Sequence, residues 1–474
     1  MASPLISQAP ELLTRPHATI LAYCKKCFPP ISLPVIFFAL AIGLGTGLLH
    51  HQASTTSASI SWSDALFTAT SAVCVTGLAV VDTGSYFTRF GQNVILGLIQ
   101  IGGLGIMTFS SLAFYLWRRR VSITDQIAVG QALTVGQGMN LGRFLKGMLI
   151  WTLAIEFLGA ALIYLVSPDG VTAYAAIFHA ISAFCNAGFS LYANNLMGWQ
   201  DAWLVNLVVM VLIVAGGIGF SVLIELGVFI PAKIAHQHKK NGRRPSRLSW
   251  QSGIVLRTTF WLIITGWGAI FLAEYTEAVP LSRSALTALF QSVTCRTAGF
   301  NTVDIGQVTT ISLLVMLVLM FIGGGPGSCA GGIKVTSFSV LWRFVVAQLK
   351  GSEQTVIGRF AVSQAAINKA LLLVVIEGMI LFIAIITLTI TEGGDSPLLV
   401  TRGLFLEIVF EAVSAIGTVG LSMGLTFKLS LVGKWIITLL MFIGRLGPLV
   451  FLAVIQELRK EHFFKWPEEN IQIG

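Results

Sequence analysis

Four short stretches of the sequence carry a glycine where neither a helix nor a strand favours one. The stretches are SAVCVTGL (71–78), SAFCNAGF (182–189), SVTCRTAGF (292–300) and SAIGTVGL (414–421). Their last glycines are separated by 111, 111 and 121 residues. Glycine permits backbone angles that turn carbonyl oxygens toward one axis, and rings of carbonyls can replace the hydration shell of a monovalent cation. The repeat therefore predicts a carbonyl-lined cation path.

The residues expected to line this path are the last glycine of each stretch and the two residues before it. They are Val75, Thr76, Gly77, Asn186, Ala187, Gly188, Thr297, Ala298, Gly299, Thr418, Val419 and Gly420. No triplet contains an acidic residue, so backbone carbonyls are the predicted ligands of the cation and a carboxylate ring is not expected. Glycines that only let helices pack closely are the alternative, but close packing does not explain a short helix before each stretch.

The composition indicates that these stretches lie in a membrane. Of 474 residues, 55% are hydrophobic and 11% charged, with a mean hydropathy of +0.82, whereas soluble domains carry about 25% charged residues. A span needs about 20 apolar residues, which leaves room for roughly eight spans. Long apolar runs occupy 31–49, 91–117, 144–166, 203–230, 257–273, 309–322 with 333–349, 370–391 and 430–456.

A shorter amphipathic segment precedes each glycine stretch. These segments are 61–73, 171–184, 281–294 and 400–415. As helices they would be about 18 to 24 Å long, too short for a hydrocarbon core of about 30 Å, so re-entrant helices are predicted. The expected fold is an all-α polytopic membrane protein with eight membrane spans and four re-entrant pore helices. Four K⁺-channel-like helix–pore helix–helix (M1-P-M2) repeats would surround a pseudo-fourfold pore.

The repeat also sets the expected boundaries along the chain. They are a cytoplasmic N-terminal segment 1–30, repeat 1 at 31–120, repeat 2 with flanking cytoplasmic loops at 121–256, repeat 3 at 257–368, repeat 4 at 369–456 and a cytoplasmic C-terminal tail 457–474. Lys and Arg gather on one side of this topology, so the positive-inside rule places both termini in the cytoplasm of a multi-pass cell-membrane protein. The net charge of +9 is therefore not taken as a sign of nucleic-acid binding. Cys24 and Cys27 lack a second ligand pair, so no metal or redox role is expected.

One segment, GGGPGSCAGG at 323–332, has no equal in the other repeats. A proline and six glycines in ten residues cannot hold a regular helix, and irregular backbone at membrane depth must be buried or line a wet path. We interpret it as an intramembrane gating loop, with a simple helix kink as the alternative. The expected gate residues are Gly323, Gly324, Gly325, Pro326, Gly327, Ser328, Gly331, Gly332 and Arg445.

Two arginines are expected to act near this loop. Arg445 stands where repeats 1 and 2 carry Gly103 and Gly217, and an arginine at mid-span costs about 2.5 to 3.5 kcal/mol. We expect it to hydrogen-bond the loop and to set a positive barrier in a closed path, with snorkelling to an interface as the alternative. Arg296 is expected to point away from the path as a structural brace.

The expected surroundings of these groups are less specific. Carboxylates in or near membrane segments are the possible partners of Arg296, namely Glu156, Glu377, Glu407 and Glu411. Lys334 is expected as a cytoplasm-side anchor after the loop. For Asn301 and Asp304, concentration of cations at the outer mouth and plain loop capping are left open.

These motifs resemble the Trk/Ktr/HKT superfamily of cation transporters. The resemblance rests on CVTGL, CNAGF, CRTAGFNTVD and GTVGLS, with GGGPGSCAGGIKVTS and FIGRLGP, and covers residues 31 to 456. It implies one filter glycine per pore loop and transport of K⁺ or Na⁺. Relatives with serine at the first filter position tend to conduct Na⁺, so Gly77 implies K⁺. The short N-terminus resembles the Ktr-type membrane subunit.

The resemblance also implies partners and an energy source. Ktr-type subunits form homodimers on a cytoplasmic ring of nucleotide-binding (RCK/KTN-type) subunits, and their uptake is often stimulated by Na⁺. No cofactor is expected in this chain, so ATP or ADP would be bound by the partner. A membrane potential supplies about 2.3 kcal/mol per charge per 100 mV, which suffices for passive K⁺ uptake. A Na⁺-conducting relative is the main alternative. A secondary active transporter is less favoured, and an enzyme is not expected.

Overall fold

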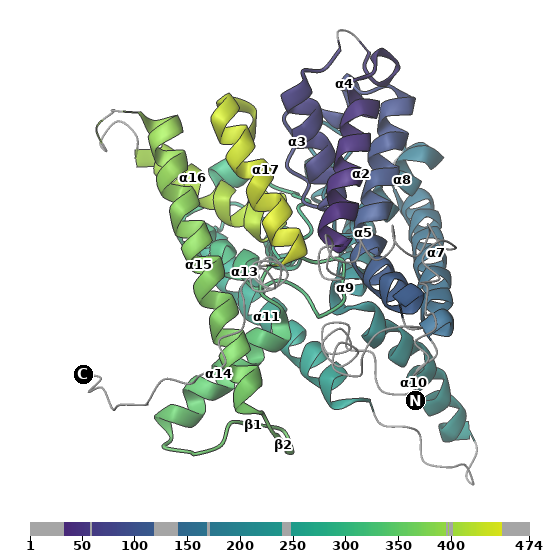
Figure 1. Ribbon diagram of the computed structural model, residues 1–474, viewed down its shortest axis with the longest axis vertical. Helices are drawn as coiled ribbons and strands as arrows, with labels where there is room; N and C mark the ends of the chain where they lie inside the picture. Colours follow the sequence, from purple (N-terminus) through teal and green to yellow (C-terminus); the bar gives the residue numbers. More distant parts are fainter. Residues whose placement is uncertain are drawn as a thin grey trace, which may run out of the picture.

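The structure is a computed structural model that describes residues 33–56, 59–117, 141–167, 171–238, 248–394, 397 and 402–447. It is helical almost throughout, as Figure 1 shows, apart from a short hairpin of β1 (Val356–Ile357) and β2 (Phe360–Ala361). Cys24 and Cys27 and the expected N- and C-terminal segments, 1–30 and 457–474, lie outside the described residues.

The larger helices follow one another in four similar sets. The sets are α2 (Leu33–His50), α3 (Trp62–Val73) and α5 (Arg89–Trp117); α7 (Leu141–Val166), α8 (Ala173–Phe184), α9 (Trp203–Ile218) and α10 (Phe220–His238); α11 (Trp250–Glu274), α12 (Leu281–Thr294), α13 (Thr310–Phe321) and α14 (Val335–Leu349); and α15 (Gln364–Gly393), α16 (Arg402–Ile416) and α17 (Leu431–Leu446). Each set runs from a long helix through a short helix of 12 to 15 residues to a further helix.

Short one-turn elements complete the chain between these sets. They are η2 (Gln52–Ser54), α4 (Thr83–Tyr86), η3 (Met197–Trp199), η4 (Ile305–Gln307) and η5 (Thr426–Lys428). All five lie between the helices of a set, on the stretches that link the first helix to the short helix or the short helix to the helix after it.

The short helices have sequence-encoded ends. Ser61 and Thr172 precede α3 and α8, and their hydroxyls accept the amide hydrogens of Asp64 and Ala175, which supplies partners for otherwise unpaired first-turn amides. At the other end the chain leaves the helix through a residue with positive φ, a conformation that stops helix propagation. Each glycine stretch therefore begins in the last turn of its short helix and continues into the loop after it.

Several helices are suited to a membrane by length and composition. Among the described residues, α11, α15 and the Leu145–Val166 part of α7 are long and apolar enough to cross on their own. The helices α9 and α10 pass the same test as a pair, with a bend of 107° between them. The apolar run expected over 203–230 is therefore broken at Gly219, whose φ of +97° and ψ of 143° lie in a region that essentially only glycine adopts. We call this bend the α9–α10 elbow.

The first and last sets meet and close the arrangement. The helices α3 and α17 pack against each other, and Lys434 of α17 forms an ion pair with Asp64 of α3 at 2.6 Å. Figure 1 shows α15 on one flank, α7 on the other, and α10 and α14 extending to the same end of the molecule. A large buried core made of residues from all four sets holds these helices together.

Carboxylates at the ends of long helices link neighbouring elements. Glu274, the last residue of α11, accepts the amide and the hydroxyl of Thr309, both at 2.8 Å, at the start of α13. Glu392 near the end of α15 accepts from the amide of Ser430 at 3.0 Å and from its hydroxyl at 2.6 Å. The negative charge lies at a helix N-terminus in both cases, where the helix dipole favours it. These contacts fix the start of α13 against the end of α11, and the start of α17 against the end of α15.

Candidate ion pathway

The four glycine stretches share one backbone conformation. In each stretch two residues, separated by one, have positive φ: Val75 and Gly77, Asn186 and Gly188, Thr297 and Gly299, Thr418 and Gly420. The non-glycine φ values lie between 48° and 66° and the glycine values between 69° and 97°. Positive φ is uncommon for Val and Thr, so its recurrence at four equivalent positions indicates a common structural requirement.

The four glycines follow one another in a closed ring. A Cβ atom built on Gly77 would lie 3.1 Å from the Cα of Gly188, and one built on Gly188 would lie 3.0 Å from the Cα of Gly299. The corresponding distances are 3.2 Å from Gly299 to Gly420 and 3.1 Å from Gly420 back to Gly77. A side chain at any of these positions would meet the neighbouring backbone. The sequence repeat thus brings segments more than a hundred residues apart around one narrow opening.

Hydroxyl groups on the short helices hold this backbone in place. The Oγ of Ser71 accepts the amide of Gly77 at 3.0 Å, and the Oγ of Ser414 accepts the amide of Gly420 at 3.0 Å. In the other two stretches Ser182 donates to the carbonyl of Phe189 and Thr294 donates to the carbonyl of Phe300. Each serine or threonine therefore bonds a short helix to its own glycine loop. All four stretches begin with a serine, but in the third Thr294 makes the loop bond while Ser292 donates to the carbonyl of Ile263, and none of these bonds was predicted.

Three threonine hydroxyls in the ring stretches lack a protein partner. The Oγ1 atoms of Thr76, Thr297 and Thr418 are buried, and no described residue hydrogen-bonds them. Unpaired buried hydroxyls are costly, and a hydroxyl oxygen can coordinate a cation. The 323–332 loop packs directly against one of them, since a Cβ on Gly331 would lie 3.0 Å from the Cβ of Thr418.

The 323–332 loop is a closed irregular segment between α13 and α14. Its ends are joined by a parallel bridge between Ile322 and Ile333. The amide of Gly323 donates to the carbonyl of Ile333 at 2.8 Å, and the amide of Val335 donates to the carbonyl of Gly324 at 3.0 Å. The loop is therefore a defined turn held by its own backbone, and more than a kink in a continuous helix.

The loop also contacts the second set of helices through the α9–α10 elbow. The amides of Gly325 and Cys329 donate to the carbonyls of Gly217 and Gly216, at 2.7 and 3.2 Å. These carbonyls are free for the loop because the helix stops at Gly219. Close approach requires glycine on both sides, since a Cβ on Gly219 would lie 2.6 Å from the carbonyl oxygen of Pro326. Sequence reasoning noted the AGGIG glycines but missed this role.

Arg445 lies buried against the loop, as its sequence position led us to expect. Its Nη1 donates to the carbonyl of Cys329, and its Nη2 donates to the carbonyl of Gly102 in α5. The side chain is only 4% exposed, which excludes snorkelling to an interface. Lys334 follows the loop and its Nζ donates to the carbonyl of Ala330 at 2.6 Å. Lys334 therefore contacts the loop itself, in addition to starting α14.

Arg296 bonds the loop and none of the expected carboxylates. Its Nη2 donates to the carbonyl of Gly323 at 2.7 Å, and no carboxylate among the described residues is paired with it. The expectation of a carboxylate partner was wrong because the loop backbone offers an acceptor closer to the glycine stretch. Its place away from the ring agrees with a bracing role, which stays a prediction.

Two of the four expected carboxylates have other hydrogen-bond partners. Glu156 accepts from the amide of Gln100 at 3.1 and 3.0 Å, which connects α7 to α5. Glu411 accepts from Ser422 at 2.7 Å and also from Thr426, both just after Gly420. Glu411 thus joins α16 to the segment on the far side of the ring. The first link joins residues 56 positions apart, which no local motif could have found, whereas the partners of Glu411 lie 11 and 15 positions away.

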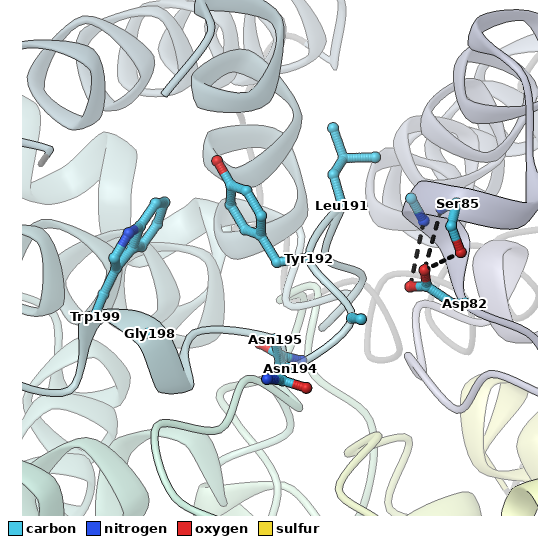
Figure 2. Close-up of a pocket in the computed structure, with 10 residues that line it drawn as sticks. Asp82, Ser85, Leu191, Tyr192, Asn194, Asn195, Gly198 and Trp199 are labelled. Atoms are coloured by element: carbon cyan, nitrogen blue, oxygen red, sulfur yellow. Dashed lines mark hydrogen bonds between the residues drawn. The ribbon is translucent and has the colours of Figure 1, made fainter. Parts of the chain in front are cut away.

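A cavity of about 570 Å³ lies beside the ring, between the segments that follow α3 and α8. Figure 2 shows Tyr192 and Trp199 on one side and Asp82, bonded to Ser85, on the other. Asn195, which also lines it, donates to the carbonyl of Gly188 at 3.4 Å. Asn195 therefore links the wall of the cavity to the glycine ring, and none of the four ring glycines lines the cavity itself. It has polar groups on one wall and aromatic rings on the opposite wall.

Asp304 and Asn301 have local structural partners. The carboxylate of Asp304 accepts the amide of Gly306 and the side-chain amide of Gln307, both at 3.0 Å, and Asn301 donates to the carbonyl of Val303. Of the two readings left open by the sequence, loop capping is the one with observed contacts. Within the described ranges, no cluster of three or more His, Cys, Asp or Glu side chains is arranged to hold a metal ion.

Comparison with known proteins gives a consistent family. The family model TrkH, described as a cation transport protein, matches residues 35–465. The Ktr system potassium uptake protein B of Bacillus subtilis (strain 168) is 41% identical over 459 residues, covering 94% of this chain and 97% of the relative. The protein of the same name from Vibrio alginolyticus is 36% identical and covers 88% and 89% of the two chains.

Two further relatives extend this similarity. The potassium/sodium uptake protein NtpJ of Enterococcus hirae is 35% identical, covering 95% of this chain and 98% of the relative. The crystal structure of the potassium transporter TrkH from Vibrio parahaemolyticus superposes with a TM-score of 0.71 at 20% identity, covering 90% and 84% of the chains. The solved structure supports the fold, and the sequence relatives support the family.

Proposed function

Since this chain belongs to the TrkH family of cation transport proteins, we propose that it is the ion-translocating membrane subunit of a K⁺ uptake system. The family consists of ion transporters, so the protein is a multi-pass membrane transporter and not an enzyme. In the proposal, K⁺ passes inward through a carbonyl-lined filter, and the 323–332 loop gates the path. The fold is then four M1-P-M2 repeats around a pseudo-fourfold pore.

The closed ring of Gly77, Gly188, Gly299 and Gly420 is the observation that carries this proposal. Residues with positive φ alternate along each stretch and the four glycines close a ring, an arrangement in which we infer that the carbonyls of each stretch turn toward a common axis. Carbonyl oxygens arranged in this way replace the water shell of a monovalent cation. The absence of carboxylates in the four triplets favours a monovalent cation over a divalent one, which prefers carboxylate ligands.

The proposed gate rests on the position of the 323–332 loop. The loop packs against Thr418, the first residue of the fourth filter triplet, and bonds the α9–α10 elbow, Arg296 and Arg445. It therefore contacts elements from all four proposed repeats, since Cys329 also lies 3.5 Å from the carbonyl of Gly103. A segment with contacts on every side of an axis crosses that axis. In the conformation described it obstructs the path, and the Arg445 charge adds an electrostatic barrier.

The proposal includes partners that the chain does not contain. Two of the relatives are named Ktr system potassium uptake protein B, a name that implies a system of more than one subunit. We propose a homodimer in the cell membrane with both termini in the cytoplasm, and a cytoplasmic ring of nucleotide-binding RCK/KTN-type subunits that controls the gate. ATP or ADP is then bound by that ring. This chain needs only K⁺, its cargo, at the filter carbonyls, with Na⁺ stimulation as an expected property.

Uptake of ⁸⁶Rb⁺ into liposomes that hold the purified chain tests the proposed substrate. Competition by external K⁺ but not by equal Na⁺ is expected, and Gly77→Ser is expected to make Na⁺ a competitor, because a side chain at Gly77 meets the Gly188 backbone. Gly306→Ser, at a glycine outside the ring, is the matched control. Equal competition by Na⁺ in the unaltered chain would reject a K⁺-selective filter. It would favour the second candidate, a Na⁺-conducting transporter, to which the printed name of NtpJ points.

A further inference from the structure

An apolar cavity of about 520 Å³ lies beside the 323–332 loop. Its walls come from α13, α14, α15 and α16 and include Ile322 and Ile333, the two paired ends of the loop. Every lining residue is Leu, Val, Ile or Phe, and the volume lies within the range of about 300 to 1,000 Å³ typical of ligand pockets. We propose that this cavity binds an acyl chain of a membrane lipid and that the bound chain stabilises the closed loop. The second half of the proposal rests on the gating role proposed above.

The cavity lies at the depth of the lipid hydrocarbon. The helix α15 has 30 residues, so it is about 45 Å long. Val374 and Leu381, which line the cavity, follow the first residue of α15 by about 15 and 26 Å along the helix axis. Both therefore lie in the middle third of a helix that extends past a hydrocarbon core of about 30 Å. At this depth the surrounding solvent is lipid tails.

The cavity is continuous with the surface that faces those tails. Val318 on α13 lines the cavity and is 62% exposed, and Val375 on α15, next to the lining residue Val374, is 57% exposed. Water does not fill this space, because a buried water needs two to four polar partners. An empty cavity would forfeit the dispersion contacts of its walls. A lipid tail is the apolar group present in excess at this position.

A bound tail would contact both sides of the loop. Phe321 and Ile322 lie before the loop, and Ile333 and Phe338 lie after it, and all four line the cavity. Movement that separates Ile322 from Ile333 would change the shape of the cavity and remove contacts to the tail. Because a ligand shifts an equilibrium toward the state that it binds better, an occupied cavity favours the loop conformation described here. Occupancy should therefore lower ion flux.

The test uses the full chain in liposomes with a phosphatidylglycerol that carries a photoactivatable diazirine midway along one acyl chain. After irradiation, labelled peptides are identified by mass spectrometry. Label on Phe321 and Phe338 should exceed label on Phe157 of α7, which is 79% exposed and reports ordinary lipid contact. Label at the cavity no higher than at Phe157 would overturn the lipid site. This measurement does not depend on transport. It can therefore reject the lipid site even if the proposed transport function is correct, and support it even if that function is wrong.

A variant that fills the cavity tests both halves of the proposal. Val374→Phe should reduce the cavity label to the Phe157 level and raise the ⁸⁶Rb⁺ flux, because it displaces the tail that stabilises the closed loop, and Leu341→Phe is a second filling variant from α14. Val375→Phe makes the same change one residue away on the lipid-facing side and should leave label and flux unchanged. Equal flux in Val374→Phe and Val375→Phe would overturn the effect on the gate. Crosslinks from this face to a second copy of the chain, in place of lipid label, would overturn the lipid as occupant.

Discussion

The backbone amide of Phe220 donates to the carbonyl of Gly327 over 3.1 Å. This bond joins the first residue of α10 to the 323–332 loop, directly at the elbow where α9 ends. Gly216 and Gly217 on the α9 side accept two further amides from the same loop. A tilt of α10, which runs on to His238, would therefore pull on the loop through its backbone. The elbow provides a direct mechanical route from the end of α10 to the proposed gate.

Gly219→Ala should raise ion flux by disturbing this contact. The residue has φ +97°, a conformation that costs about 1 to 3 kcal/mol for a residue with a side chain, and a Cβ would lie 2.6 Å from the carbonyl oxygen of Pro326. The strain falls on the closed conformation, so ⁸⁶Rb⁺ efflux from preloaded liposomes should rise by about tenfold, since about 1.4 kcal/mol is a factor of ten.

Gly217→Ala is the matched control for the elbow. Gly217 lies in α9, and a Cβ there would meet only the side-chain amide group of Asn186, at 3.4 Å. Its efflux should stay near that of the unaltered chain. If a folded Gly219→Ala protein shows the same efflux as Gly217→Ala, the elbow does not hold the gate closed.

Arg445→Ala should also increase basal flux. The change removes two charge-assisted hydrogen bonds, to the carbonyls of Cys329 and Gly102, each worth about 1.5 to 3 kcal/mol, together with the positive barrier. A rise in ⁸⁶Rb⁺ flux of at least about tenfold is expected. Arg445→Lys, which keeps the charge but cannot reach both carbonyls in a fork, should give an intermediate flux.

Arg283→Ala serves as the comparison for loss of an arginine. Arg283 forms an exposed ion pair with Asp201 at 3.1 Å, far in sequence from the loop, and its loss should not change flux. Unchanged flux in both arginine variants, with both proteins folded, would remove Arg445 from the gating mechanism.

The sequence predicted the parts of this site that depend on local pattern. Four glycine stretches, each after a short amphipathic helix, are visible as a repeat, and a positive φ at Gly77 and its equivalents is compatible with their residue type, whereas the positive φ two residues earlier, at Val75 and its equivalents, was not predicted. The irregular nature of the 323–332 loop follows from its glycines and proline. A buried mid-span arginine also predicts a nearby carbonyl or carboxylate partner, and the structure supplies the carbonyls of Cys329 and Gly102.

The remaining parts depend on contacts between distant segments. The sequence around Gly219 is apolar on both sides, so hydropathy alone reads a continuous helix. The break becomes favourable only because the loop supplies amides for the carbonyls of Gly216 and Gly217. In the same way, carboxylates were the possible partners of Arg296 because opposite charges attract. In the folded chain its guanidinium donates to the carbonyl of Gly323.

Ser71→Ala and Ser414→Ala should weaken ion selectivity without blocking flux. Each change leaves a glycine amide, that of Gly77 or Gly420, without its acceptor at 3.0 Å. An unsatisfied buried amide costs about 1 to 3 kcal/mol, so the glycine stretch should relax away from its ring geometry. Competition of ⁸⁶Rb⁺ uptake by Na⁺ should then increase. Ser63→Ala, at a partly buried serine in the first turn of α3, should leave competition unchanged, and no difference between these variants would show that the hydroxyls of Ser71 and Ser414 do not shape the filter.

The ion pair between Lys434 and Asp64 should stabilise the fold more than the pair between Arg283 and Asp201. The first pair joins α17 to α3 at 2.6 Å with side chains 21% and 22% exposed, whereas the second pair is 36% and 66% exposed. Exposed pairs contribute about 0.2 to 1 kcal/mol, and breaking buried pairs costs about 3 to 5 kcal/mol. Lys434→Met should therefore lower the unfolding temperature of the detergent-solubilised protein more than Arg283→Met does. A double-mutant cycle with Asp64→Asn isolates the interaction energy of the pair. If this energy is no larger than that between Arg283 and Asp201, helix packing alone holds α3 against α17.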